Sequence, residues 1–177
     1  FPAAFSNLAV TVTVSLEEKK PNSRWKISLQ GLRGTLTSQV TFPRLAGLLD
    51  PGNEKLAVPQ WMGQILDHPR QHLSELNNPV KKFEWSYPGQ LSLQCLALYN
   101  TERCGLYAAC DDTSAFLKNF SIALQNSNRL LYAVHNFPAL DSTVDSYEPA
   151  YSAIIGSFKG DWLTAAEQYR DWGTRQW

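Results

Sequence analysis

The chain has 177 residues, enough for one domain with its own hydrophobic core. Apolar residues make up 44% and aromatic residues 12%, and 16 basic residues balance 16 acidic ones, giving a formal net charge of +0. This balance excludes long-range attraction to nucleic acid or an anionic membrane, and no stretch approaches the ~20 apolar residues of a membrane span, so we expect neither partner.

The first thirty residues alternate between apolar and polar types with a period of two, which predicts a β-hairpin. The apolar positions of its first strand are Leu8, Val10, Val12, Val14 and Leu16. Those of the returning strand are Trp25, Ile27 and Leu29. We therefore expect one solvated face and one face that is buried in the core.

The middle of the chain predicts further strands. Residues 34–42 form a third strand that ends at Pro43, because proline cannot donate to a β-ladder. Residues 56–66 indicate one edge or bulged strand, interrupted by Pro59 and Gly63. A short helix is expected within residues 68–78.

Residues 91–100 carry no charge and predict a central strand that is buried on both faces. A turn and a returning strand follow at 105–110, then a hairpin over 114–137 and a last strand over 149–158. About eight to ten strands joined by short turns predict an all-β fold, an antiparallel β-sandwich with one late α-helix.

Three cysteines are too few for a disulfide scaffold. Cys95 and Cys110 fall roughly opposite each other on neighbouring strands, so they form either a disulfide or, as we favour, two buried free thiols. One glycosylation sequon begins at Asn119. These features do not fix the compartment, although a secreted or extracytoplasmic location is favoured.

The C-terminal segment predicts an amphipathic helix that starts at Asp161, an N-cap residue. One face of this helix carries Trp162, Ala165, Ala166, Tyr169 and Trp172. The first two turns are expected to fold back on the sheet. The aromatic residues from Trp172 to Trp177 are expected to face a domain that this chain lacks, and the two expectations are compatible.

Five segments then follow one another in an order that resembles a known protein family. They are "TFPRLAGL", "LAVPQWMGQIL", "YPGQLSLQCLALYN", "GLYAACDD" and "FKGDWLTAAEQYRDWGTRQW". This order is similar to the N-terminal galactose-mutarotase-like β-sandwich (supersandwich) of large glycoside-hydrolase-like proteins of the α-galactosidase-like clans, in which a (β/α)₈ catalytic barrel follows. The likeness covers roughly residues 41–177.

The resemblance implies a sandwich domain over residues 1–160 and a linker helix over 161–177 that leads to an absent catalytic barrel. It implies interdomain contacts by Trp162, Tyr169, Trp172 and Trp177, and carbohydrate as the substrate class. One departure is Cys110, which stands where the family pattern often has histidine before the acid, so that histidine's role is not carried over.

Glycoside hydrolysis needs two carboxyl groups about 5–9.5 Å apart across the scissile bond. The candidates are Asp111, Asp112, Asp141, Asp145 and Glu148. Adjacent acids on a strand point to opposite faces, so Asp111 and Asp112 do not form such a pair. We expect no catalytic residue here; the two acids either end a strand and open a turn or line a sugar subsite.

The histidines give no convincing site. His68 and His72 have the i, i+4 spacing of helical zinc ligands, but no third ligand is apparent. His135 is expected to be a hydrogen-bonded residue of a strand. We predict no metal and no cofactor.

Trp61, Trp85 and Tyr87 are the remaining candidates. Exposed aromatic rings are platforms for the apolar faces of sugars, whereas buried ones belong to the core. The leading hypothesis is a non-catalytic domain of a carbohydrate-active enzyme. The alternatives are a free-standing carbohydrate-binding module or lectin, and a sandwich that serves only protein contacts.

Overall fold

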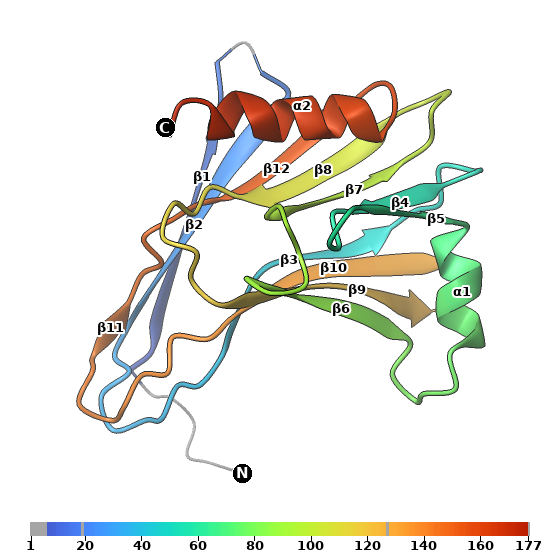
Figure 1. Ribbon diagram of the computed structural model, residues 1–177. Coiled ribbons are helices and arrows are strands. Elements are labelled where there is room, and N and C mark those ends of the chain that lie inside the picture. The colour runs from blue at the N-terminus through green and yellow to red at the C-terminus, as the bar shows by residue number, and fades with distance from the viewer. Residues whose placement is uncertain (1–6, 19, 127, 177) are drawn as a thin grey trace.

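The computed structural model describes residues 7–18, 20–126 and 128–176. Two antiparallel sheets pack face to face, and one helix lies at the C-terminal end of the chain (Figure 1). The all-β antiparallel sandwich expected from the sequence is therefore confirmed. Neither helix of the described residues is long and apolar enough to cross a membrane.

Within the described residues, the larger sheet has eight strands. Seven follow the order β1-β2-β12-β8-β7-β4-β5, and the eighth, β11, pairs with β2 beside this path. The bounds are Ala9–Leu16 (β1), Asn22–Gln30 (β2), Lys55–Val58 (β4), Gln64–Asp67 (β5), Cys95–Tyr99 (β7), Gly105–Cys110 (β8), Ser146–Tyr147 (β11) and Ala153–Phe158 (β12).

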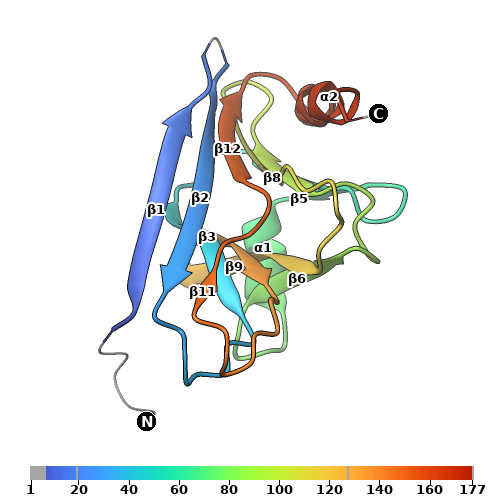
Figure 2. The same cartoon turned by 90° about the vertical axis from the view of Figure 1, so that its left-hand side faces the viewer.

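The smaller sheet has the order β3-β10-β9-β6. Its strands are Val40–Leu48 (β3), Lys82–Tyr87 (β6), Lys118–Asn126 (β9) and Arg129–Asn136 (β10). The expected short helix is α1, Pro69–Glu75, and the C-terminal helix is α2, Trp162–Gly173. Figure 2 shows α2 on the outer face of the larger sheet, away from the smaller one.

The core has two layers because the larger sheet is covered on both faces. The layer between the sheets contains Leu98 of β7, together with Phe120 and Tyr132 of the smaller sheet. The layer under α2 contains Tyr99 of β7 and Ala165 of the helix. Neighbouring residues of β7 thus enter different layers, which explains why this uncharged run is buried on both faces, as predicted.

The third strand differs from its prediction, because Pro43 lies inside β3 and is buried. β3 is an edge strand of the smaller sheet, so one side of it needs no ladder donors. The register with β10 shifts between Ala133 and His135, opposite Pro43. An edge position and a bulge therefore accommodate a residue that usually ends a strand.

The segment predicted as one interrupted strand forms a hairpin instead. β4 and β5 pair antiparallel, with Val58 opposite Gln64, and the turn between them contains both Pro59 and Gly63. The two residues that weakened the strand prediction are the turn formers. β5 is the edge strand of the sheet, as expected for this region.

The hairpin of β1 and β2 is present, but the apolar face of β1 is not buried as predicted. Every residue of β1 is exposed, and Val12 retains 47% of its accessible surface. The core beneath β2 includes Val40 of β3, the last strand of the smaller sheet. The larger sheet extends one strand further, and the described residues leave that strand uncovered.

The three cysteines are free thiols, and Cys95 and Cys110 are buried, in agreement with the favoured prediction. Cys95 pairs in register with Ala109, so Cys110 is the next residue and points to the opposite face of the sheet. Cys95 lies in the layer under α2 and Cys110 in the layer between the sheets. This register rules out a disulfide between them.

Candidate functional site

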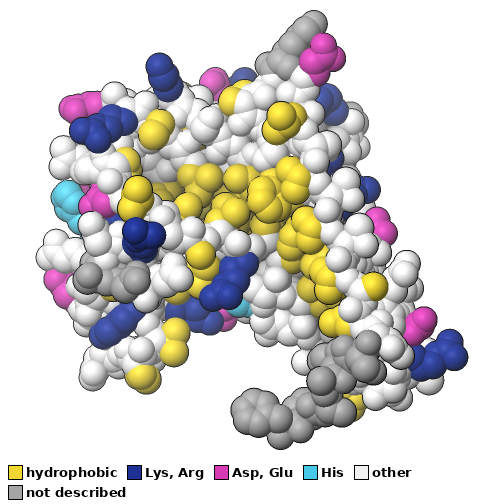
Figure 3. Space-filling model, turned by 180° about the vertical axis from the view of Figure 1, so that it is seen from behind, with side chains coloured by type: hydrophobic (Ala, Val, Ile, Leu, Met, Phe, Trp, Pro, Cys, Tyr) yellow, Lys and Arg dark blue, Asp and Glu magenta, His cyan; other side chains and the backbone are white. Residues whose placement is uncertain are grey.

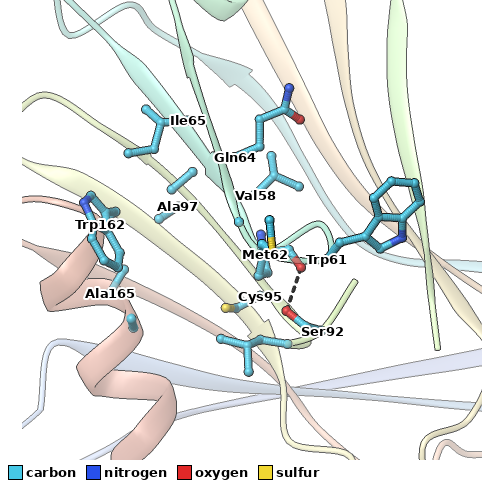
Figure 4. A pocket seen from close by; sticks show the side chains of 15 residues that line it. Val58, Trp61, Met62, Gln64, Ile65, Ser92, Cys95, Ala97, Trp162 and Ala165 are labelled. Atoms are coloured by element: carbon cyan, nitrogen blue, oxygen red, sulfur yellow. Dashed lines mark hydrogen bonds between the residues drawn. The ribbon is translucent and has the colours of Figure 1, made fainter. Parts of the chain in front are cut away.

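An apolar groove of about 340 Å³ lies between α2 and the β4–β5 hairpin. Its floor is the outer face of β4 and β7. Figure 4 shows Trp162 of α2 and Trp61 of the hairpin turn on opposite sides of the groove, with Met62 between them. The groove is therefore built by segments that are far apart in the sequence.

The position of α2 follows from local signals. Asp161 caps the helix as predicted, since its carboxylate accepts a hydrogen bond from the Leu163 N–H at 2.9 Å. Ala165 is buried against the sheet, and its small side chain lets the helix approach closely. Trp162 starts the helix and retains 47% exposure at the rim of the groove.

The hairpin turn presents two large apolar side chains to solvent. Trp61 is 72% exposed and Met62 is fully exposed. The backbone of Trp61 is left-handed, with φ of 52°, a conformation that non-glycine residues seldom adopt. Its N–H donates to the Gln90 carbonyl at 3.0 Å, and Ser92 donates to the Pro59 carbonyl, so the turn is held in place.

The chemistry of the groove is that of a contact surface. Its lining includes no carboxylate, imidazole, ammonium or guanidinium group, and its only ionisable side chain is the Cys95 thiol. Burial raises the pKa of that thiol to about 12, so it stays protonated at neutral pH. The groove can bury apolar surface but holds no acid–base pair.

A second cluster of sequence candidates surrounds Lys118, which is 0% exposed. Its ammonium donates to Asp112 at 2.6 Å, to Gln94 at 3.1 Å and to the Phe116 carbonyl at 2.6 Å. It also lies 4.4 Å from the ring centre of Tyr151. Lys118 begins β9, whereas Asp112 and Gln94 flank β8 and β7, so the cluster ties the two sheets together.

Asp112 also opens a turn, as one of the two alternatives predicted. Its carboxylate accepts hydrogen bonds from the Ser114 N–H at 2.8 Å and the Phe116 N–H at 2.7 Å. Tyr87 is half-buried beside it, with its ring centre 5.1 Å from the Lys118 nitrogen. The structure thus brings Tyr87 and Asp112 together, but around a buried cation.

Asp111 points elsewhere, as the strand geometry required. Its carboxylate lies 2.8 Å from Arg24, which also contacts Glu17 at 3.0 Å. Burial raises the pKa of Asp111, and the Arg24 guanidinium opposes that effect. Since Asp111 and Asp112 bind different cations, they do not form a catalytic pair.

Trp85 is a core residue, 6% exposed, and its indole N–H donates to Gln60 at 3.1 Å. Its ring faces are therefore closed to a sugar. Trp61 is the one aromatic candidate of the three that is open to solvent.

The helix residues expected at an interdomain contact are partly covered by the sandwich. Tyr169 packs against the layer under α2, and its ring lies 5.2 Å from that of Trp172 in an edge-on arrangement. Tyr169 and Trp172 are half-buried, and Trp162 is exposed. Trp177 lies outside the described residues.

The histidines have structural surroundings. His68 precedes α1 with a left-handed backbone, so it does not share a helix face with His72. His135 is a hydrogen-bonded strand residue, as expected, with its ring nitrogens 2.7 Å from Gln39 and 3.0 Å from Ser121. The described residues contain no group of three or more potential metal ligands.

Sequence reasoning missed Lys118 and Met62. A lysine in the alternating run "FLKNFS" resembles any solvent-facing strand residue, and its partners become visible only in the fold. Met62 follows Trp61 in the turn, and two adjacent large apolar residues in a turn are a signal that could have been used.

Residues 147–177 match a family described as a domain of unknown function (DUF6259). This stretch begins at the last residue of β11 and covers β12 and α2, and it therefore includes the helix side of the groove. A search of curated proteins finds no significant match.

Proposed function

We propose that this chain is a non-catalytic β-sandwich domain of a carbohydrate-active enzyme, a glycoside hydrolase, and that its groove receives the catalytic barrel of the same protein. The observation that carries the proposal is the exposed apolar groove between Trp61, Met62 and Trp162. An exposed apolar surface of this kind is typical of an interface that another domain covers.

The resemblance supports the same surface. Two of the five segments that carry it, "LAVPQWMGQIL" and "FKGDWLTAAEQYRDWGTRQW", supply opposite sides of the groove. In the family that the chain resembles, the second of these segments leads into the barrel, which supports a barrel as the occupant of this groove. The DUF6259 match over residues 147–177 includes the second segment but assigns no activity.

The polar content of the groove favours a protein occupant over a sugar. A sugar site combines an aromatic platform with several directed polar groups. Apart from the indole N–H groups of Trp61 and Trp162, the polar side chains in the lining are Gln64 and Ser92, and the Ser92 hydroxyl already donates to the Pro59 carbonyl at 2.9 Å. Too few partners remain for the hydroxyl groups of a sugar ring.

The first test is titration of the chain with galactosides, glucans and other oligosaccharides. We expect no binding tighter than ~1 mM by calorimetry. We also expect no hydrolysis, because the groove has no carboxylate pair. Turnover that persists after rigorous purification would overturn the assignment as non-catalytic.

One observation favours the second candidate function, a free-standing carbohydrate-binding module: Trp61 is an open ring on a rigid turn. In that case a sugar binds with a dissociation constant of ~1 mM or lower. Trp61→Ala then abolishes binding, whereas Phe116→Ala, a change to another exposed aromatic residue outside the groove, leaves it intact.

A further inference from the structure

The free edge of β1 lacks the devices that usually protect an edge strand. Among the described residues, β1 ends the larger sheet and pairs with β2 on one side only. Proteins guard such edges with charged residues, proline or bulges. Residues 8–16, "LAVTVTVSL", contain no charge and no proline, and all eight residues of β1 pair with β2 without a shift in register.

The side of β1 that faces the same way as the buried side of β2 is also uncovered. Val12 lies opposite Ile27 and Val10 opposite Leu29, and both partners on β2 are buried beneath the sheet. Directly opposite residues point to the same face, so these valines extend the inner apolar surface beyond the smaller sheet. In Figure 3, hydrophobic side chains form a band that continues down the side on which β1 and β2 lie.

The sequence of this strand is nearly the same in both directions. Around Val12 as the centre, Val10 corresponds to Val14, Thr11 to Thr13 and Leu8 to Leu16. Ala9 and Ser15 are the one unlike pair, and both are small. When an antiparallel strand pair lies on a two-fold axis, each residue faces the residue of the other copy that is equally far from the axis, so the two must be compatible. Around Val12, this symmetry pairs valine with valine and threonine with threonine.

We propose that a second copy of this chain pairs antiparallel with β1, with the two-fold axis at Val12. The two larger sheets then join into one continuous sheet. Val10 of each copy faces Val14 of the other on the inner face, and Thr11 faces Thr13 on the outer face, both favourable cross-strand pairs.

The surroundings of the strand permit this arrangement. Figure 2 shows β1 at the margin of the molecule, away from both helices. Charged residues begin at Glu17, which the two-fold axis places opposite Asn7, so no like charges meet. The groove beside α2 lies elsewhere on the larger sheet and is independent of this surface.

The oligomeric state of the purified chain tests the proposal. Sedimentation equilibrium should give a mass of twice 19.9 kDa at ~100 µM, with reversible dissociation on dilution. Val12→Lys puts two ammonium groups opposite each other and should weaken the dimer at least ~10-fold, whereas Val12→Thr keeps a β-branched side chain and should leave a dimer. A monomer at every concentration overturns the proposal, as does an assembly larger than two.

Cross-linking distinguishes this register from any other contact between two copies. It does not rely on a variant such as Val12→Lys, which could also change the stability of the folded chain. In a Cys104→Ala background, Val12→Cys should form an intermolecular disulfide under mild oxidation, because the axis places position 12 opposite itself. Val10→Cys alone should not form a disulfide, because position 10 of one copy faces position 14 of the other. The two introduced cysteines then lie four residues, or ~13 Å, apart along the strands. Mixing Val10→Cys with Val14→Cys chains should restore cross-linking. A dimer that resists Val12→Lys or that cross-links equally at positions 10 and 12 contradicts the pairing.

Discussion

Replacing Asp112 with alanine should lower the free energy of unfolding by about 3–5 kcal/mol, because the buried ammonium group of Lys118 then has no counter-ion. Lys118 is 0% exposed, and its remaining neighbours, Gln94 and the Phe116 carbonyl, are neutral. Asp112→Ala also removes the acceptor for two backbone N–H groups in the turn that follows. Urea unfolding monitored by circular dichroism measures the loss.

Two variants separate the charge from the turn. Asp112→Asn keeps an oxygen for the turn but removes the negative charge, so it should lose most of the same stability. Asp111→Ala is the matched control, because its partner Arg24 is partly exposed and keeps Glu17 as a second acidic partner, so the change leaves no buried charge without a counter-ion and should cost only about 1 kcal/mol. Equal, small losses for Asp112→Ala and Asp111→Ala would contradict the role of the buried pair.

The second large effect is a loss of stability in alkali. Burial raises the pKa of both Cys95 and Cys110 from 9.0 to about 12. Between these values the unfolded chain loses its thiol protons while the folded chain keeps them, so the unfolded state is favoured increasingly as pH rises. Stability is therefore complete below pH 9 and falls between about pH 9 and 12.

The expected size follows from about 1.36 kcal/mol per pH unit for each thiol. At pH 10.5, the middle of this range, the loss is about 2 kcal/mol for each thiol and about 4 kcal/mol for the two. Burial also raises the pKa of Tyr147 and Tyr169 to about 12, which acts in the same direction.

Urea unfolding at pH 8 and pH 10.5, with a reductant present, measures this dependence. The Cys95→Ala/Cys110→Ala double variant should lose clearly less stability between the two pH values than the parent chain. Cys104→Ala, which changes an exposed thiol, should follow the parent. Identical pH dependence in the parent and the double variant would show that the buried thiols are not the cause.

Local signals in the sequence predicted much of the fold. The period-two alternation of β1 and β2, the uncharged run that includes β7 and the Asp161 cap each depend on residues close together in the chain. Hydrophobic periodicity identifies which side chains share a face. It does not reveal whether another layer covers that face, which is why the exposure of Val12 was not predicted.

The incorrect predictions have the same cause, because they depend on strands that are far away in the sequence. Pro43 can lie within β3 because that strand is at an edge and is bulged, and both facts depend on distant strands. The free thiols were predicted correctly, but the disulfide alternative stayed open because only the register of β7 and β8, which pairs Cys95 with Ala109 and not with Cys110, excludes it. The partners of Lys118 come from both sheets, so no local pattern marks it as buried.

The candidate site was predicted in parts but not as a unit. Trp61 was a candidate for a sugar platform or for the core, and Trp162 for a contact with a second domain, and the fold places both beside one groove. Asp112 and Tyr87, each a candidate either for a sugar subsite or for a structural role, contact the buried Lys118. The proposal of a docking surface therefore rests on the convergence of the hairpin turn with α2.

Radical footprinting with mass spectrometry tests that docking surface most directly, since it measures the oxidation rates of Trp61, Met62 and Trp162 individually. The 177-residue chain is compared with the whole natural gene product, and Phe116, exposed and outside the groove, serves as the internal reference. The account predicts that the three groove residues oxidise much more slowly in the whole protein, while Phe116 is unchanged. Equal rates for Met62 and Trp162 in both would contradict it.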